Sequence, residues 1–196
     1  MKFEQYNPEE ALQTLIEGNR KFVADEGTTG RHLSQKRKEL ILEQHPIACI
    51  LGCADARVPP QLIFDRKLGD LFIIRVAGNV LDDVVLASLE YGVFVLNTPL
   101  VVVMGHYGCG AVDATLNGHN FTSHIRTLTN LVEPAVEWAK TQEGDTLDLA
   151  VRKNILNQTE KLHSTEQIFK SKIDSGQLLI KSAYYDLATG KVDFID

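Results

Sequence analysis

Three side chains that could bind a metal follow two apolar segments of the sequence. Cys53 comes directly after the run 47–52, and His106 and Cys109 follow the run 100–105. Two thiolates and one imidazole suit zinc, and a catalytic zinc site keeps three protein ligands and leaves its fourth position for water or substrate. These residues therefore predict one Zn²⁺ per chain, held between the ends of two strands.

Two charged residues follow the first cysteine at alternate positions. Asp55 and Arg57 are close enough in the chain to form a carboxylate–guanidinium pair beside the metal. Such a pair would keep Asp55 ionised and directed at zinc-bound water; in a closed state, without Arg57, Asp55 itself would be the fourth ligand. A free cysteine is more often a small buried hydrophobe. The joint occurrence of Cys-x-Asp-x-Arg and His-x-x-Cys favours the metal site over that alternative.

Further short motifs surround these residues. The six blocks are Cys53-Ala-Asp-Ala-Arg57, Val58-Pro-Pro60, Gly69-Asp-Leu-Phe72, Arg75-Val-Ala-Gly-Asn79, Leu89-Glu-Tyr91 and Gly105-His-Tyr-Gly-Cys-Gly110. In this order and spacing the chain resembles the β-class carbonic anhydrases, from about Pro8 to Phe194. It departs from the family at Ala54 and Ala56, where serine is common, so hydroxyl groups that would help to orient Asp55 are lacking.

The resemblance implies a zinc lyase, a carbonate dehydratase. Its expected reaction is the reversible hydration of carbon dioxide to bicarbonate and a proton by zinc-bound hydroxide. Asp55 and Arg57 would be catalytic, and the implied substrate-binding residues are Gln44, Phe72, Ala77, Tyr91 and Gly110. The Gln44 and Tyr91 groups would come from the neighbouring subunit of a homodimer, with a homotetramer left open. From the residues alone, Gln44 is a surface residue, Phe72 a core residue and Tyr91 a half-buried helix residue.

One position distinguishes two branches of that family. An allosteric branch has Trp three residues before the first zinc cysteine, whereas this chain has Ile50 there and its only tryptophan is Trp138. The resemblance thus implies an open, plant-like site with Asp55 off the metal near neutral pH. Two alternatives remain: a hydrolase of carbonyl sulfide or carbon disulfide on the same scaffold, and a non-enzymatic zinc or redox-sensing protein.

Composition limits the partners and the compartment. The 196 residues carry a net charge of -6 with a pI near 5.5, which argues against nucleic acid and against an anionic membrane surface. No apolar segment reaches the ~20 residues that span a bilayer, and the N-terminus lacks the apolar core of a secretory signal. Three cysteines, two of them needed as thiolates, favour a reducing compartment, so we expect a cytoplasmic protein.

The expected fold is α/β: a mostly parallel central sheet flanked by helices, with an N-terminal helical arm, a C-terminal antiparallel hairpin and a dimer-forming surface. We expect one domain over 1–196, with 1–45 as the arm and 46–196 as the zinc-binding core. The predicted strands are 47–52, 71–76, 100–104, 177–185 and 192–195, and the predicted helices are 8–26, 34–44, 60–64, 84–96, 110–116, 121–140 and 147–173. Whether the first helix packs on its own domain or on a partner is left open.

Overall fold

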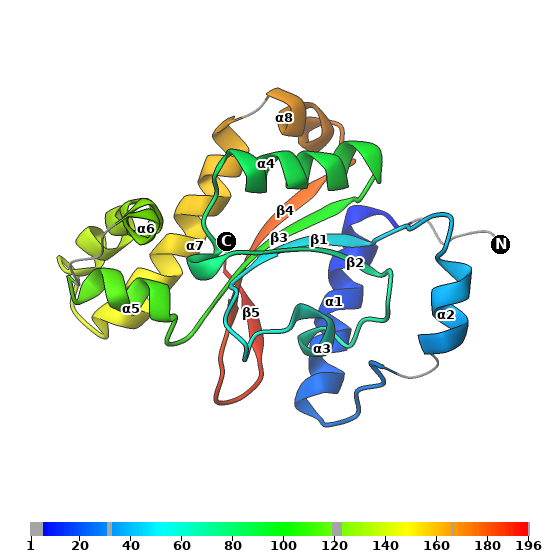
Figure 1. Ribbon diagram of the computed structural model, residues 1–196, viewed down its shortest axis with the longest axis horizontal. Coiled ribbons are helices and arrows are strands. Elements are labelled where there is room, and N and C mark those ends of the chain that lie inside the picture. Colours follow the sequence, from blue (N-terminus) through cyan, green and yellow to red (C-terminus); the bar gives the residue numbers. More distant parts are fainter. Residues whose placement is uncertain (1–5, 31–32, 119–122, 166, 196) are drawn as a thin grey trace.

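A five-stranded sheet forms the centre of the computed structural model, which describes residues 6–30, 33–118, 123–165 and 167–195 (Figure 1). The strands lie in the order β2-β1-β3-β4-β5. The first four in that order are parallel, and the last runs antiparallel to β4. Their bounds are β1 (Ala48–Gly52), β2 (Leu71–Arg75), β3 (Leu100–His106), β4 (Leu179–Tyr185) and β5 (Val192–Phe194). The mostly parallel sheet and the C-terminal hairpin expected from the sequence are confirmed.

The two central strands explain where the functional residues meet. Every residue of β1 and of β3 is buried, as expected for parallel strands covered on both faces. Gly52 at the end of β1 pairs with Met104 in β3. Because parallel strands end at the same edge, the residues that follow β1 and those at the end of β3 are brought together at the carboxyl edge of the sheet.

Helices cover both faces of the sheet (Figure 1). α1 and α3 pack with one apolar cluster, and helices from α4 to α8 contribute to the cluster on the opposite face. A 3₁₀ turn follows β2, and a π-helical turn follows α4. The bounds are α1 (Pro8–Val23), α2 (Leu33–Glu39), α3 (Pro60–Ile63), η1 (Ala77–Asn79), α4 (Asp83–Glu90), η2 (Tyr91–Val95), α5 (Gly110–Leu116), α6 (His124–Ala139), α7 (Thr146–Thr165) and α8 (Gln167–Asp174).

The first helix packs on its own sheet. Asn7 caps it by accepting a hydrogen bond from the Glu10 N–H at 2.9 Å, while the Asn7 N–H donates to the Glu10 carboxylate at 3.0 Å. At Gly18 the helix approaches so closely that a side chain there would collide with the carbonyl oxygen of Phe64 at the end of α3. The sequence left open whether α1 packs on its own domain or on a partner, and in this structure it packs on its own domain.

Several helix ends differ from the expectation. α2 ends at Glu39 rather than at residue 44, and Ile41 and Leu42 in the segment that follows are 75% and 93% exposed. α4 ends at Glu90 and continues as η2, where Gly92 lies against the sulfur of Cys49.

The remaining differences concern the C-terminal half. The helix expected over 121–140 begins at His124 and runs through Pro134 without a break, and residues 119–122 lie outside the described part. The helix expected over 147–173 is described as α7 and α8, on either side of residue 166, which also lies outside it. Among the described helices, each is too short or too polar to cross a membrane.

Candidate metal centre

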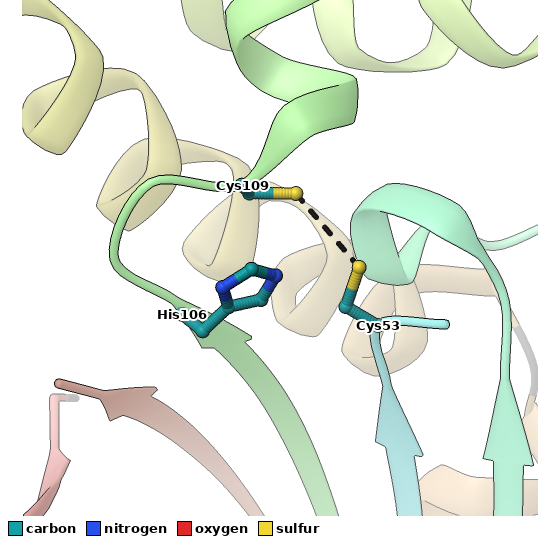
Figure 2. Close-up of side chains that lie close together, drawn as sticks. All are labelled: Cys53, His106 and Cys109. Carbon is teal, nitrogen blue, oxygen red and sulfur yellow. Dashed lines mark hydrogen bonds between the residues drawn. The ribbon is translucent and has the colours of Figure 1, made fainter. Parts of the chain in front are cut away.

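Cys53, His106 and Cys109 converge at the carboxyl edge of the sheet (Figure 2). Their ligand atoms all lie within 4.8 Å of one another, and the Sγ atoms of Cys53 and Cys109 are 3.9 Å apart. Two sulfurs at about 2.3 Å from a tetrahedral zinc ion would be about 3.8 Å apart. A disulfide would require a separation of about 2.05 Å, so the spacing fits two ligands of one ion.

The imidazole of His106 is oriented for coordination. Its Nδ1 lies 3.0 Å from the carbonyl oxygen of Tyr107, so Nδ1–H donates there and Nε2 carries the free lone pair. Nε2 is buried and has no hydrogen-bond partner among the described residues. A buried polar atom without a partner is costly unless a ligand satisfies it, and a metal ion between the two sulfurs would do so.

The two thiols form an electrostatic pair. The hydrogen bond with Cys109 lowers the pKa of Cys53 well below its ordinary value, and the same bond raises the pKa of Cys109. In the absence of a cation the pair therefore shares one proton, and a dication would displace that proton and bind both sulfurs. Cys49 differs, since burial raises the pKa of its thiol to about 12 and it lies within the core.

Asp55 and Arg57 form a tight pair next to these ligands. The Arg57 side chain donates from Nε to Oδ1 at 2.9 Å and from its terminal nitrogen to Oδ2 at 2.7 Å, and the Arg57 backbone N–H donates to Oδ1 at 2.9 Å. These bonds hold the pKa of the Asp55 carboxyl well below its usual range. Oδ2 of Asp55 lies 3.9 Å from Nε2 of His106. An ionised carboxylate is therefore fixed at the rim of the cluster.

Arg75 holds the loop that carries Cys53 and Asp55. Its Nε donates to the carbonyl oxygen of Cys53 at 2.8 Å, and its terminal nitrogen donates to that of Asp55. The guanidinium thus anchors two backbone carbonyls of the motif loop, and the partners are 20 and 22 residues away in the sequence.

Three of the five predicted pocket residues lie away from the metal ligands of their own chain. The rings of Phe72 and Tyr91 are in contact, with centroids 6.0 Å apart. Phe72 pairs with Cys49, four residues before Cys53, which corresponds to about 13 Å along a strand. Gln44 lines a surface hollow with Leu71, at the start of β2. These residues gather toward the amino end of the strands.

The other two predicted pocket residues lie on the metal side of the sheet. Ala77 begins η1 one residue after the end of β2, and Gly110 begins α5 directly after Cys109. A Cβ atom at Gly78 would lie 3.3 Å from the Cβ of Ala111, so the two turns are in contact. Ala77 and Gly110 thus lie on neighbouring segments next to the cluster.

The fold and the cluster define an α/β protein with a candidate metal centre, and comparison with known proteins identifies the family. The family profile for carbonic anhydrase matches residues 48–192. Carbonic anhydrase 2 of Mycobacterium tuberculosis is 36% identical and spans 94% of this chain and 91% of its own length. The carbonic anhydrase of Mycolicibacterium smegmatis is 34% identical and spans 95% of this chain and 93% of its own length.

Solved structures lead to the same family. The β-carbonic anhydrase CcaA has a TM-score of 0.74 at 28% identity, covering 94% of this chain and 95% of its own. The Coccomyxa β-carbonic anhydrase, solved in complex with acetazolamide, has a TM-score of 0.75 at 27% identity, covering 94% of this chain and 86% of its own. This chain belongs to the carbonic anhydrase family and is an enzyme of its β class.

Proposed function

We propose that the chain catalyses the zinc-dependent, reversible hydration of carbon dioxide to bicarbonate and a proton. The observation that carries the proposal is the buried Nε2 of His106, which has no hydrogen-bond partner in the described structure. Two sulfurs 3.9 Å apart lie within 4.8 Å of this nitrogen, so one ion could bind all three atoms. When bound there by Cys53, His106 and Cys109, zinc would supply the Lewis acidity that makes water nucleophilic near neutral pH.

Asp55 would orient the reacting water. Its Oδ2 lies next to the cluster and its carboxyl stays ionised, so it can accept a hydrogen bond from the water and leave a lone pair directed at the carbon of the substrate. Arg57 would hold Asp55 in that position through its three hydrogen bonds. The same bonds support an open, plant-like site, in which Asp55 is paired with Arg57 rather than with the metal.

A complete site would need two chains. Gln44, Phe72 and Tyr91 lie toward the amino end of the strands, whereas the metal ligands lie at the carboxyl edge. Gln44 and the two rings would therefore complete the site of a neighbouring subunit, while Ala77 and Gly110 line the site of their own. Exposed apolar side chains in the same segments support a homodimer: Ile41 and Leu42 line the hollow with Gln44, and Tyr91 and Val95 lie on η2. Each subunit would be one domain, with 1–45 as its arm and 46–196 as its core, and its three free thiols favour a reducing compartment such as the cytoplasm.

The zinc ligands can be tested with a matched pair of cysteine variants. Cys53→Ala should purify without zinc and without activity, because a ligand is lost. Cys49→Ala, which changes a buried cysteine of β1 four residues before Cys53, should retain about one zinc per chain. Equal zinc content in the two variants would contradict the assignment.

The reaction is tested by stopped-flow hydration of carbon dioxide, with carbonyl sulfide as the competing substrate and acetazolamide as the inhibitor. We expect turnover of carbon dioxide that acetazolamide inhibits and that Asp55→Asn lowers by about 100-fold, the lower range for positioned acid–base groups. A zinc-loaded wild type that turned over carbonyl sulfide faster than carbon dioxide would refute the proposed substrate. A zinc-loaded chain inactive on both would point to a non-enzymatic role.

A further inference from the structure

Two buried amide side chains on α7 lie outside the ligand set and outside the predicted pocket. Asn154 is 1% exposed and Gln158 is 5% exposed. They are one helical turn apart, and the Nε2 of Gln158 donates to the Oδ1 of Asn154 at 3.2 Å. Burial of an amide is costly unless its donors and acceptors are satisfied, so the partners of the remaining polar atoms indicate what the pair does.

Both amides bind one short backbone segment after β2. The Nδ2 of Asn154 donates to the carbonyl oxygen of Gly78 at 2.8 Å, and the Leu81 N–H donates to the Oε1 of Gln158 at 3.0 Å. Further along the helix, the ammonium of Lys161 donates to the carbonyl oxygen of Leu81 at 3.0 Å. The segment 78–81 is thus held at both ends by side chains more than seventy residues away in the sequence.

The held segment contains an unfavourable backbone turn. Gly78 has φ 70° and Asn79 has φ 44°, both in the left-handed region that is disfavoured for residues other than glycine. Such a conformation persists only where the surrounding structure imposes it. Hydrogen bonds from α7 flank the strained residue Asn79, because Asn154 binds the carbonyl of Gly78 before it and Gln158 binds the N–H of Leu81 after it.

Val76, the residue that leads into this turn, contacts the chain on both sides of Cys53. The Val76 N–H donates to the carbonyl oxygen of Gly52 at 3.1 Å, and the Ala54 N–H donates to the carbonyl oxygen of Val76 at 3.3 Å. These two bonds flank Cys53 on both sides. A shift of the turn would therefore move a metal ligand.

We infer that Asn154 and Gln158 are positioning residues for the metal centre, which fix the 78–81 turn against the Cys53 loop and thereby hold the sulfur in place for the metal. The inference rests on the proposed zinc site. It separates these amides from Thr159, the next residue on α7. The Thr159 hydroxyl accepts a hydrogen bond from Ser182 of β4 at 2.9 Å and donates one to the Ile155 carbonyl at 3.0 Å, and both partners lie outside the turn. Mutation of groups that hold metal ligands in place commonly lowers metal affinity by about 10-fold to 100-fold.

The test compares two nearly isosteric substitutions at neighbouring positions of α7 in the full-length zinc-loaded protein. Gln158→Met removes the amide and retains a side chain of similar length, and Thr159→Val removes a buried hydroxyl of similar environment. A third variant, Asn154→Ala, removes the bond to Gly78 directly. Zinc release to a chromogenic chelator is the first readout, and the absorption bands of the cobalt-substituted protein are the second, because they report ligand geometry. Unfolding midpoints correct for general loss of stability.

We expect zinc release to accelerate about 10-fold in Gln158→Met and Asn154→Ala and the cobalt bands to shift, while Thr159→Val matches the wild type in both readouts. Release rates in Gln158→Met equal to those in Thr159→Val, with unshifted cobalt bands, would overturn the inference even if Asn154→Ala failed to fold. Carbon dioxide hydration is measured separately. A wild type that binds zinc but is inactive would refute the proposed reaction and leave the comparison of release rates intact.

Discussion

Replacing Asn19 by alanine should test how α1 is attached. Asn19 is 7% exposed, and its Nδ2 donates to the carbonyl oxygens of Ile63 at 3.1 Å and Gly190 at 2.9 Å. Its Oδ1 accepts from the Val192 N–H at 2.9 Å. One side chain on α1 thus ties α3 and the β4–β5 hairpin to the helix. Each buried hydrogen bond contributes about 1 kcal/mol net, so the loss of three should lower the free energy of unfolding by about 3 kcal/mol.

Urea denaturation followed by circular dichroism measures this loss, and Thr14→Ala on the same helix is the control. The Thr14 hydroxyl donates to the Glu10 carbonyl in the preceding turn, at 2.7 Å, so its removal should change stability by less than about 0.5 kcal/mol. Because the partners of Asn19 belong to its own chain, the effect should not depend on protein concentration. A loss no larger than that of Thr14→Ala, or one seen only at concentrations where subunits dissociate, would refute intrachain packing of α1.

Three further results are expected. The pKa of the Asp55 carboxyl is depressed, so the carboxylate is present at neutral pH and is lost only as the pH falls below the usual carboxyl range. Asp55→Asn should therefore lower the rate of carbon dioxide hydration by a constant factor between about pH 6 and 9. A pH profile displaced from that of the wild type would contradict this. Removing zinc with dipicolinate should lower the melting temperature by about 10 °C, and adding zinc should restore it, because an ion at 1,000 times its Kd contributes about 4 kcal/mol. Gly92→Ala should cost about 1–3 kcal/mol by collision with the Cys49 sulfur, measured by denaturation, and Cys49→Ala in the same chain should recover part of that loss; a neutral Gly92→Ala would rule out the close approach.

The grouping of the ligands could be predicted from the sequence because the information is local. Cys53 follows one buried strand directly, His106 ends another, and Cys109 lies three residues later. Parallel pairing then requires the ends of these strands to meet. Asp55 and Arg57 are two positions apart in one loop, so their pairing could also be predicted from their spacing in the sequence.

The supporting contacts could not be predicted, because their partners are far apart in the chain. Asn19 binds a carbonyl 171 residues away, and Asn154 binds one 76 residues away. The change from α4 to the π-helical turn depends on Gly92 meeting Cys49 of β1, which no periodicity within the helix encodes. Phe72 was predicted as a pocket residue by resemblance, and its register with β1 places it about 13 Å along the strand from Cys53, with the ring of Tyr91 against it.

The opposite placement of these aromatic rings and the metal ligands makes complementation between defective chains possible. If the site is formed by two chains as proposed, a subunit with Cys53→Ala retains an intact Tyr91, and a subunit with Tyr91→Ala retains an intact metal centre. A mixed dimer of the two would contain one complete site and one that lacks both parts. Two preparations that are each impaired should therefore gain activity when dissociated together and allowed to reassociate, as two incomplete halves combine into one working enzyme.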